Sequence, residues 1–347
     1  MGSPSIVVGW NGLPAYGARL IQAGRDHLGV QFPVLGTKPD VPIDGMEEIL
    51  GDGLKWLEAG RSYSWGQLKM PVPELFIHTG WGYSHFNSLA DEVRANGGKV
   101  VGMFDNCWKP TLRQFIGSIY FRMFLRRKYF AAWVPGKSGK RLAKQLGFGV
   151  KRVFVGMYGS SSEVFSNKVP MSKRKKQILF VGRLIHRKGI LELVEAFRQL
   201  SGQFPEWNLL LLGDGDLKQQ ISLTDKIEIM PFQQPSKVAE LMNESRIFAL
   251  ASREEHWGLV VHEASLCGCA LLIQQQIGAA FDLAQQGNAV VFKKTNISLI
   301  KEAFQKILNW SDSEYDNANT TSVALASHFG PDVWARTLED IIKRAHE

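Results

Sequence analysis

The chain has 347 residues with 45% hydrophobic and 21% charged positions and a formal net charge of +8. Its mean hydropathy of −0.11 and this composition exclude a disordered protein, and no apolar run reaches the ~18 residues that a membrane-spanning helix needs. Three cysteines are too few for a disulfide framework, and the amino terminus lacks the pattern of a secretory signal, so we expect a two-domain cytoplasmic protein.

The chain begins with a predicted strand, a loop and a helix. Residues 5–9 form an apolar run, and the loop from Trp10 to Pro14 contains Gly12 and precedes a pattern typical of a helix. A glycine-bearing loop between a strand and a helix suits phosphate, because the first backbone N–H groups of the helix point toward the loop. Gly12 is therefore a candidate ligand-binding residue.

Two further strands of this half end in polar residues. Residues 74–78 predict a strand that ends at His78, and residues 99–104 predict a strand that Asp105 follows. His78 either faces a ligand at the strand end or is a hydrogen-bonded structural histidine. Asp105 either orients the hydroxyl group of a substrate or caps the following helix.

The stretch from Thr111 to Phe130 predicts a helix with a wide apolar arc, and Arg126 and Arg127 lie near that arc. Residues 1–176 contain 25 Lys and Arg against 12 Asp and Glu, and no acidic residue lies between Asp105 and Glu163. Such an excess suggests an anionic partner, which is nucleic acid, a membrane surface or a phosphorylated substrate. The helix is either a core helix with a basic last turn or a segment that docks on an anionic membrane.

The strand predicted at residues 152–156 closes the first domain, which we assign to residues 1–165. The polar segment from Ser160 to Lys176 is the best candidate for a solvated linker. From residue 177 to 328 short apolar strands alternate with helices, which is typical of a parallel sheet with crossover helices. Residues 329–347 form a last amphipathic helix.

Two motifs of the second domain carry most of the chemistry. Residues 247–251 predict a buried strand, and the loop after it contains Glu255, while Glu263 lies eight positions later on a mostly apolar helix predicted from about 258 to 267. Another strand, at residues 178–181, runs into Gly182 and Arg183, with Lys188 before the next helix. Because carboxyl ends of parallel strands share one edge, these cations suit a diphosphate there.

The ordered motifs FVGRLIHRKGI, LLLLGDGDL and REEHWGLVVHEASLCGCALL resemble the donor domain of retaining glycosyltransferases of family 4. The resemblance spans about residues 177–329 and implies the GT-B fold. In that fold two Rossmann-like domains with parallel sheets face each other across a cleft, and a terminal helix crosses back to the first domain. The loop E-H-W-G departs from the usual E-G-F-G of the family, so the identity of the donor sugar does not transfer.

The resemblance also implies roles for particular residues. The donor is a UDP- or GDP-linked sugar, the acceptor a glycan or lipid-linked glycan, and no metal or other cofactor is expected although Asp214 and Asp216 form a D-x-D. Catalysis would involve Arg183, Lys188, Glu255, His78 and Asp105. The donor site would comprise Gly12, Gly182, Arg183, Lys188, Gly213, Gly215, Phe232, Glu255, Trp257, Gly258, Leu259, Val260 and Glu263.

The implied reaction is transfer with retention, in which the acceptor attacks the front face of the donor sugar and a donor phosphate oxygen takes its proton. The alternatives are another GT-B enzyme, such as an epimerase or a phosphorylase, or a protein that binds a sugar or a sugar nucleotide without catalysis. We expect no nucleic-acid partner. An anionic membrane surface is a possible partner of the basic half, which would make the protein peripheral on the inner face of the membrane.

Overall fold

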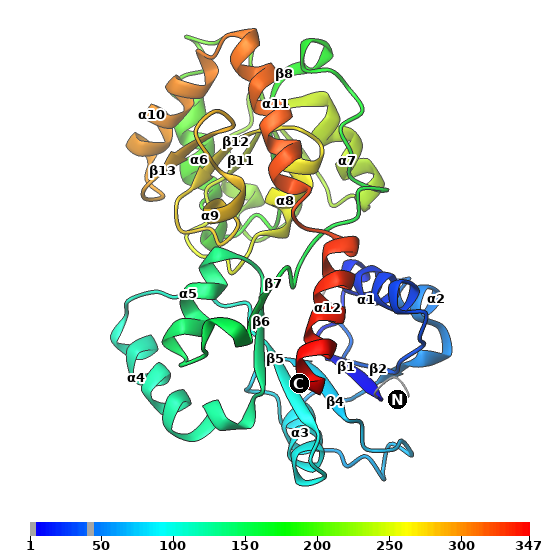
Figure 1. Cartoon of the computed structure of the whole chain (residues 1–347). Helices are drawn as coiled ribbons and strands as arrows, with labels where there is room; N and C mark the ends of the chain where they lie inside the picture. The colour runs from blue at the N-terminus through cyan, green and yellow to red at the C-terminus, as the bar shows by residue number, and fades with distance from the viewer. Residues whose placement is uncertain (1–4, 40–44) are drawn as a thin grey trace. The chain divides into compact units, whose positions relative to one another are not determined.

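The computed structural model describes residues 5–39 and 45–347, which form two compact units (Figure 1). Unit 1 contains Met1–Gly159 and Phe329–Glu347, and unit 2 contains Ser160–His328. The last helix, α12 (Pro331–His346), is therefore part of unit 1 although it follows unit 2 in the sequence.

Unit 1 is built on a seven-stranded sheet in which every neighbouring pair of strands is parallel. Its order, β3-β2-β1-β4-β5-β6-β7, reverses direction between β1 and β4, as in a doubly wound fold. The central strands are buried throughout because helices cover both faces, which explains their continuous apolar sequence. The strands are β1 (Ile6–Trp10), β2 (Val34–Gly36), β3 (Leu54–Trp56), β4 (Leu75–Thr79), β5 (Lys99–Met103), β6 (Ala131–Val134) and β7 (Val153–Val155).

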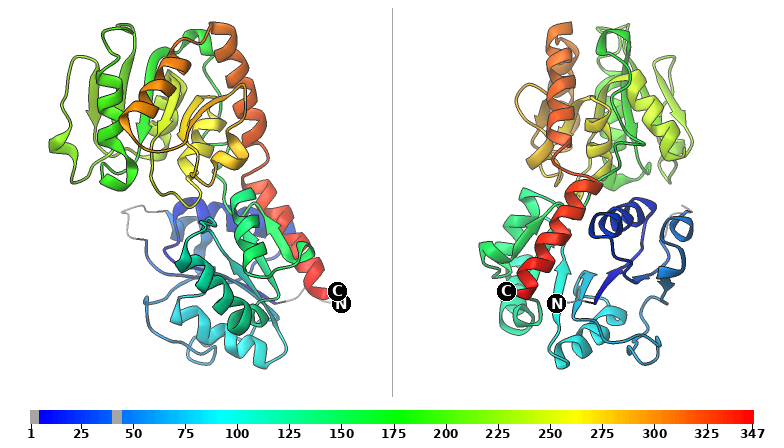
Figure 2. Two further views of the ribbon diagram at one scale, coloured as in Figure 1. Left: turned by 90° about the vertical axis from the view of Figure 1, so that its left-hand side faces the viewer. Right: turned by 45° about the vertical axis from the view of Figure 1, so that its right-hand side comes forward.

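Two apolar cores flank this sheet. One core joins the sheet to α1 and α12 through Ile21 and Trp334, and the other joins it to α3 and α5 through Phe86 and Leu142. Helix α12 runs alongside the sheet of unit 1 in both views of Figure 2. The remaining helices of unit 1 are α1 (Ala15–Leu28), α2 (Met46–Leu50), α3 (Ser84–Ala95), α4 (Leu112–Tyr120) and α5 (Lys137–Gln145).

Unit 2 repeats the same plan with six parallel strands in the order β10-β9-β8-β11-β12-β13. The order reverses between β8 and β11, so the carboxyl ends of these two strands define the ligand-binding edge of an open sheet. The strands are β8 (Lys175–Val181), β9 (Asn208–Leu212), β10 (Ile227–Met230), β11 (Ser245–Leu250), β12 (Ala270–Gln274) and β13 (Ala289–Phe292).

The helices of unit 2 connect these strands. Phe197 of α6 packs edge to face on Phe304 of α10, with ring centroids 5.9 Å apart. The connection between β9 and β10 contains a 3-10 turn, Lys218–Gln220, in place of a helix. The helices are α6 (Ile190–Arg198), α7 (Pro235–Glu244), α8 (Leu259–Leu266), α9 (Ala280–Leu283), α10 (Ile297–Leu308) and α11 (Asp312–Ala326).

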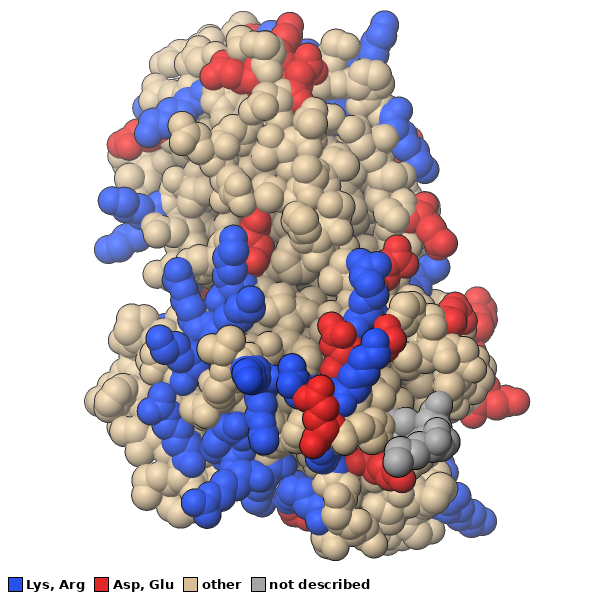
Figure 3. All heavy atoms as spheres, in the orientation of Figure 1, with Lys and Arg blue, Asp and Glu red and all other residues tan. Residues whose placement is uncertain are grey.

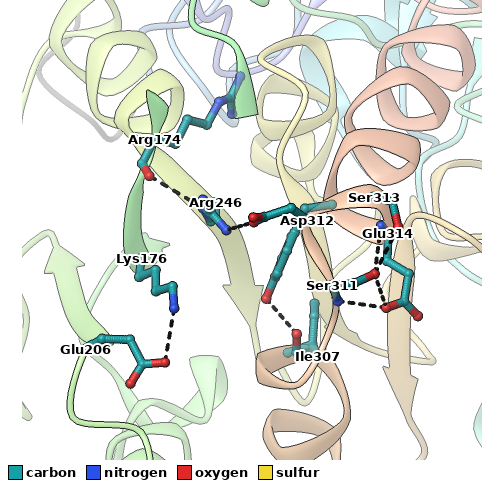
Figure 4. Close-up of polar contacts among 10 residues, drawn as sticks. Arg174, Lys176, Glu206, Arg246, Ile307, Ser311, Asp312, Ser313 and Glu314 are labelled. Carbon is teal, nitrogen blue, oxygen red and sulfur yellow. Dashed lines mark hydrogen bonds and ion pairs between the residues drawn. The ribbon is translucent and has the colours of Figure 1, made fainter. Parts of the chain in front are cut away.

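The basic run at residues 173–176 is not a solvated linker. Arg174 is buried, and its guanidinium donates to the carbonyl oxygens of Met242 (3.3 Å), Ser245 (3.2 Å) and Cys267 (2.6 Å). Lys176 already lies in β8, and its ammonium donates to Glu206 Oε1 at 3.2 Å, as Figure 4 shows. The linker interpretation failed because a guanidinium can be buried when carbonyl oxygens accept all its hydrogen bonds.

The predicted helix at residues 111–130 is interrupted. Helix α4 ends at Tyr120, a π-helical turn spans Phe121–Leu125, and a 3-10 turn spans Arg126–Lys128. The interpretation of this stretch as a core helix is wrong, because most of its apolar side chains are exposed.

Candidate functional site

The main candidate site for ligand binding in unit 2 lies at the carboxyl ends of β8 and β11. The Lys188 ammonium donates to Glu255 Oε2 at 2.6 Å, and both side chains are largely buried, with 10% and 16% exposure. Lys188 ends the short 3-10 turn after β8, whereas Glu255 lies in the loop after β11. The structure therefore joins the two residues that the sequence placed 67 positions apart.

Two arginines accompany this pair. Arg187 Nη1 lies 3.7 Å from the same carboxylate oxygen of Glu255 and donates to the carbonyl oxygen of Glu254 at 2.6 Å. Arg183 is exposed, and its guanidinium makes no hydrogen bond or ion pair with any residue in the described part of the chain. Sequence reasoning selected Arg183 and missed Arg187, which the run H-R-K-G places directly beside Lys188.

Glycines bring the backbones of neighbouring loops close together at this edge. Gly182 follows β8 and Gly213 follows β9, and a Cβ atom on Gly213 would lie 2.1 Å from the Gly182 carbonyl oxygen. A Cβ atom on Gly215 would likewise lie 2.5 Å from the Leu184 carbonyl oxygen. A side chain at Gly213 or Gly215 would clash with these backbone atoms, so both positions require glycine.

We expect Gly213→Ala to destabilise unit 2 by about 3 kcal/mol, because the methyl group clashes with a backbone atom and φ is +144°. Urea denaturation measures this loss. Gly202→Ala is the matched control, since an added Cβ there has no described atom within 4 Å, and its effect should stay below about 1 kcal/mol. Equal stabilities of the two variants would contradict the close approach.

The loop between Glu255 and α8 is fixed by backbone hydrogen bonds to a segment after β12. Gly278 donates to the Glu255 carbonyl oxygen at 3.3 Å, and Ala279 donates to that of Trp257 at 2.7 Å. Gly258 then begins α8 with φ of +88°, a conformation that favours glycine. Leu259 and Val260 form the first turn of α8, where helical N–H groups lack partners within the helix. This terminus is therefore suited to an anionic ligand.

Glu263 lies on the second turn of α8, and its carboxylate accepts a hydrogen bond from Ser160 Oγ at 2.9 Å. The surrounding protein removes water from this carboxylate and raises its pKa to about 7, although the hydrogen bond from Ser160 acts in the opposite direction. The Ser160 N–H also donates to His262 Nδ1 at 3.1 Å. Burial lowers the pKa of His262 to about 4, so this ring is neutral. Sequence reasoning missed Ser160, which lies in an S-S-S run without a distinguishing pattern.

The loop residues after β9 and β10 interact with each other. Asp214 accepts from Lys218 Nζ at 2.7 Å and from the Phe232 backbone N–H at 3.2 Å. Asp214 thereby fixes the backbone next to Phe232, whose ring is 47% exposed. An exposed aromatic ring at a strand end is suited to an apolar contact with a ligand.

Unit 1 has its own cavity, of about 280 Å³, at the reversal point of its sheet. Residues that follow β1, β4 and β5 line it, and Asp105 accepts a hydrogen bond from Tyr158 at 3.1 Å. Burial and this carboxylate raise the pKa of the Tyr158 hydroxyl well above its usual range. The lining residues are Trp10, Asn11, Thr79, Gly80, Trp81, Gly82, Tyr83, Met103, Asp105, Asn106, Met157 and Tyr158.

Gly12 and His78 lie outside the lining of this cavity. The Gly12 N–H donates to Thr37 Oγ1 at 2.6 Å. His78 is fully buried, with its ring 5.1 Å from that of Phe76 and 5.6 Å from that of Phe86. Burial lowers the pKa of His78 to about 4. The position favours the structural alternative for His78, because a neutral ring enclosed by aromatic side chains does not face a ligand.

Sequence comparison connects unit 2 to known proteins. Residues 161–320 match the family model described as glycosyl transferases group 1. A GDP-mannose:cellobiosyl-diphosphopolyprenol alpha-mannosyltransferase of Xanthomonas oryzae pv. oryzae is 22% identical over 181 residues, which cover 50% of this chain and 47% of that protein. A 2-deoxystreptamine N-acetyl-D-glucosaminyltransferase of Niallia circulans is 27% identical over 142 residues, or 39% and 36% of the two chains. The matched part thus spans about half or less of these relatives.

Structural comparison covers both units. Anabaena Alr3699/HepE in complex with UDP and glucose has a TM-score of 0.72 at 15% identity, covering 98% of this chain and 99% of that one. A glycosyltransferase of Rickettsia africae has a TM-score of 0.74 at 14% identity and covers both chains fully. These similarities confirm the predicted GT-B fold with two Rossmann-like domains. Within the described residues, every helix is too short or too polar to cross a membrane.

Proposed function

We propose that the protein is a retaining glycosyltransferase of family 4 that moves a sugar from a UDP- or GDP-linked donor to a glycan or lipid-linked glycan. The observation that carries this proposal is the buried pair of Lys188 and Glu255 at the reversal point of unit 2. An ammonium and a carboxylate held there are suited to a diphosphate and to sugar hydroxyl groups, respectively. The match of residues 161–320 to glycosyl transferases group 1 supports the same reaction class.

The cations would act on the leaving group. When the bond between the sugar and the diphosphate breaks, negative charge develops on the phosphate oxygen, and fixed cations lower the energy of that state. Lys188 is held in place by its ion pair, and Arg183 is exposed on the same loop after β8. HepE, a structural neighbour, forms a complex with UDP-glucose, which supports a nucleotide-sugar ligand for a protein of this fold.

Glu255 and Glu263 would hold hydroxyl groups of the donor. Glu255 would accept hydrogen bonds from the transferred sugar, and Glu263 from the ribose. Retention then follows from front-face attack. The acceptor oxygen bonds to the anomeric carbon as the bond from that carbon to the diphosphate breaks, and a phosphate oxygen takes the proton of the acceptor. A trapped covalent adduct between the sugar and the protein would contradict this route.

Unit 1 would supply the acceptor site. Its cavity of about 280 Å³ has a size suited to part of a sugar, and Asp105 lies on its lining as a hydrogen-bond acceptor. The Tyr158 hydroxyl orients this carboxylate. We assign Asp105 to the acceptor hydroxyl and leave His78 out of the reaction, because its ring is buried.

The test is a screen of UDP- and GDP-linked sugars against the full chain, with thermal stabilisation and nucleotide release as the two readouts. We expect one nucleotide class to raise Tm and its sugar conjugate to be consumed with release of the nucleoside diphosphate. Conversion of the sugar without nucleotide release would indicate an epimerase, and release that requires inorganic phosphate a phosphorylase. Binding of free sugar with indifference to every nucleotide would contradict the proposal.

A further inference from the structure

Helix α4 is amphipathic, but its apolar side faces outward, which is the reverse of the usual arrangement in a globular protein. Its exposed arc is apolar, whereas the side that packs on the rest of unit 1 carries Gln114 and Ser118. Gln114 is anchored there by hydrogen bonds with the Lys109 N–H (2.6 Å) and the Cys107 carbonyl oxygen (3.0 Å). Thr111 caps the helix by accepting from the Gln114 N–H at 3.3 Å. The orientation is therefore fixed by specific contacts, and it presents the apolar arc to the outside.

The exposed apolar side chains of the described residues concentrate in this stretch. Seven of the 13 large hydrophobic residues that are exposed lie between positions 112 and 124, with exposed fractions from 44% to 75%. Scattered exposed hydrophobic residues are normal, but a contiguous group of this kind marks an interaction surface. We call the group the apolar strip, and it consists of Leu112, Phe115, Ile116, Ile119, Tyr120, Met123 and Phe124.

A basic cavity adjoins the apolar strip. It has a volume of about 580 Å³, and none of its described lining residues is acidic. Gly147 lines it and accepts from Arg126 Nε at 3.0 Å, while Arg122 donates to the neighbouring Gln145 carbonyl oxygen at 2.6 Å. These contacts connect the cavity to the π-helical turn that carries Met123 and Phe124. Its cationic lining residues are Arg94, Lys99, Arg126, Arg127, Lys128 and Arg152.

Most of these charges lack an acidic neighbour. Asp91 pairs with Arg94 and lies 3.6 Å from Lys128, whereas the guanidinium of Arg126 is held by carbonyl oxygens, which leave its charge in place. Arg152 also donates to a carbonyl oxygen, that of Phe130 (3.4 Å). Burial lowers the pKa of Arg126, and repulsion from the like charge of Arg152 lowers it further. In Figure 3 Lys and Arg gather over the α4 and α5 side of unit 1.

We propose that the apolar strip and the basic cavity together form a docking site for an anionic phospholipid bilayer. The strip enters the boundary between headgroups and acyl chains with α4 parallel to the surface, and the cavity binds headgroup phosphates. A second copy of the chain is a poor occupant, because pairing this face with itself would bring the two basic cavities together. Nucleic acid is disfavoured because its bases could stack on the aromatic rings of the strip but would leave aliphatic side chains such as Leu112 and Ile116 in water, whereas a bilayer covers the whole strip.

The inference does not depend on the donor sugar or on catalysis. It would bring the protein to the surface where a lipid-linked acceptor lies. Its test therefore measures binding to vesicles, while thermal stabilisation by nucleotides reports separately on unit 2.

The experiment is flotation of the full chain with vesicles of phosphatidylcholine, alone or with about one third phosphatidylglycerol. We expect binding to the anionic vesicles, weakening with added salt, and little binding to the neutral ones. Phe115→Ser/Ile119→Ser changes the apolar strip, and Arg113→Glu/Arg127→Glu reverses an exposed charge of α4 and one of the basic cavity. Each variant should weaken binding at least about 20-fold. All four side chains are exposed, so the variants should retain the wild-type Tm and nucleotide response.

The matched controls are Leu223→Ser/Val291→Ser and Lys306→Glu, which alter exposed residues of unit 2 and should bind like the wild type. Equal binding to both vesicle types, or no binding to either, overturns the proposal. So does full binding by the two unit 1 variants. Concentration-dependent dimerisation that Phe115→Ser/Ile119→Ser abolishes would instead assign the strip to a second copy. Binding of an acidic protein in the absence of lipid, in competition with vesicles, would assign the strip to that protein.

Discussion

Lys188→Ala is expected to lower kcat/KM for sugar transfer by about 10²- to 10³-fold, the usual consequence of removing one fixed group that stabilises charge in a transition state. The Lys188 ammonium is largely buried and lies 2.6 Å from Glu255, closer than Arg187, which lies 3.7 Å from the same oxygen. Its loss also leaves Arg187, at the longer distance of 3.7 Å, as the counter-charge of the Glu255 carboxylate, which should lower Tm. Steady-state kinetics well below the Tm of the variant, with circular dichroism to confirm folding, measures the catalytic effect.

The matched control is Lys237→Ala. Lys237 also holds a carboxylate at 2.6 Å, that of Glu240, but this pair lies on the exposed surface of α7. Surface ion pairs contribute little, so the control should keep kcat/KM within about 2-fold of wild type and leave Tm almost unchanged. A folded Lys188→Ala protein with more than about a third of the wild-type kcat/KM would exclude Lys188 from the leaving-group site.

The sequence was most informative where one residue type suits one backbone position. Short apolar strands that alternate with helices predicted the parallel sheet of unit 2, and the loops after β8 and β11 hold Lys188 and Glu255 as expected, because parallel strands end at one edge. The sequence did not predict contacts between distant segments of the chain. Ser160 meets Glu263 across 103 positions, and no local pattern distinguishes this serine from its neighbours.

Helix α4 and His78 show a second limit. Periodicity identifies the apolar arc of a helix but not what covers it, so the arc of α4 fitted the core and the membrane equally well. The orientation follows from the contacts of the inner side, where Gln114 is fixed by hydrogen bonds with Lys109 and Cys107. His78 lies one residue before the end of β4, where its ring packs against those of Phe76 and Phe86. Because both faces of this strand are covered, alternation along the strand does not distinguish a ligand-facing side chain from a core side chain.

Glu263→Gln is expected to stabilise the protein at about pH 8 by about 2 kcal/mol, with no gain near pH 4.5. The pKa of Glu263 is about 7 in the folded chain and 4.5 ordinarily, so the folded state binds the extra proton between these values. Its contribution to stability is therefore full below about pH 4.5 and is lost as pH rises through 7. Glutamine stays neutral and can still accept from Ser160. Urea denaturation at several pH values measures the difference.

Glu314 provides a control of opposite sign. Its carboxylate also interacts with a serine, Ser311, at 2.8 Å, but it is exposed at the start of α11 (Figure 4). Hydrogen bonds from the Ser311 backbone and side chain lower its pKa, so its contribution is present above the ordinary value and lost as pH falls. Glu314→Gln should therefore destabilise the protein at neutral pH and not in acid. If both variants shift stability in the same direction, the burial of Glu263 does not explain its pKa.

The pH dependence of nucleotide binding should also report the ionisation of Glu263. If ribose hydroxyls donate to Glu263, they favour its ionised form, so the affinity for the nucleoside diphosphate should rise as pH increases from about 6 to 8, with release of a proton. Titration calorimetry in buffers of different ionisation enthalpy counts that proton. Glu263→Gln should abolish both the pH dependence and the proton release, whereas Glu314→Gln should preserve them. An unchanged pH dependence in Glu263→Gln would place the ribose elsewhere and leave Glu263 a structural residue bonded to Ser160.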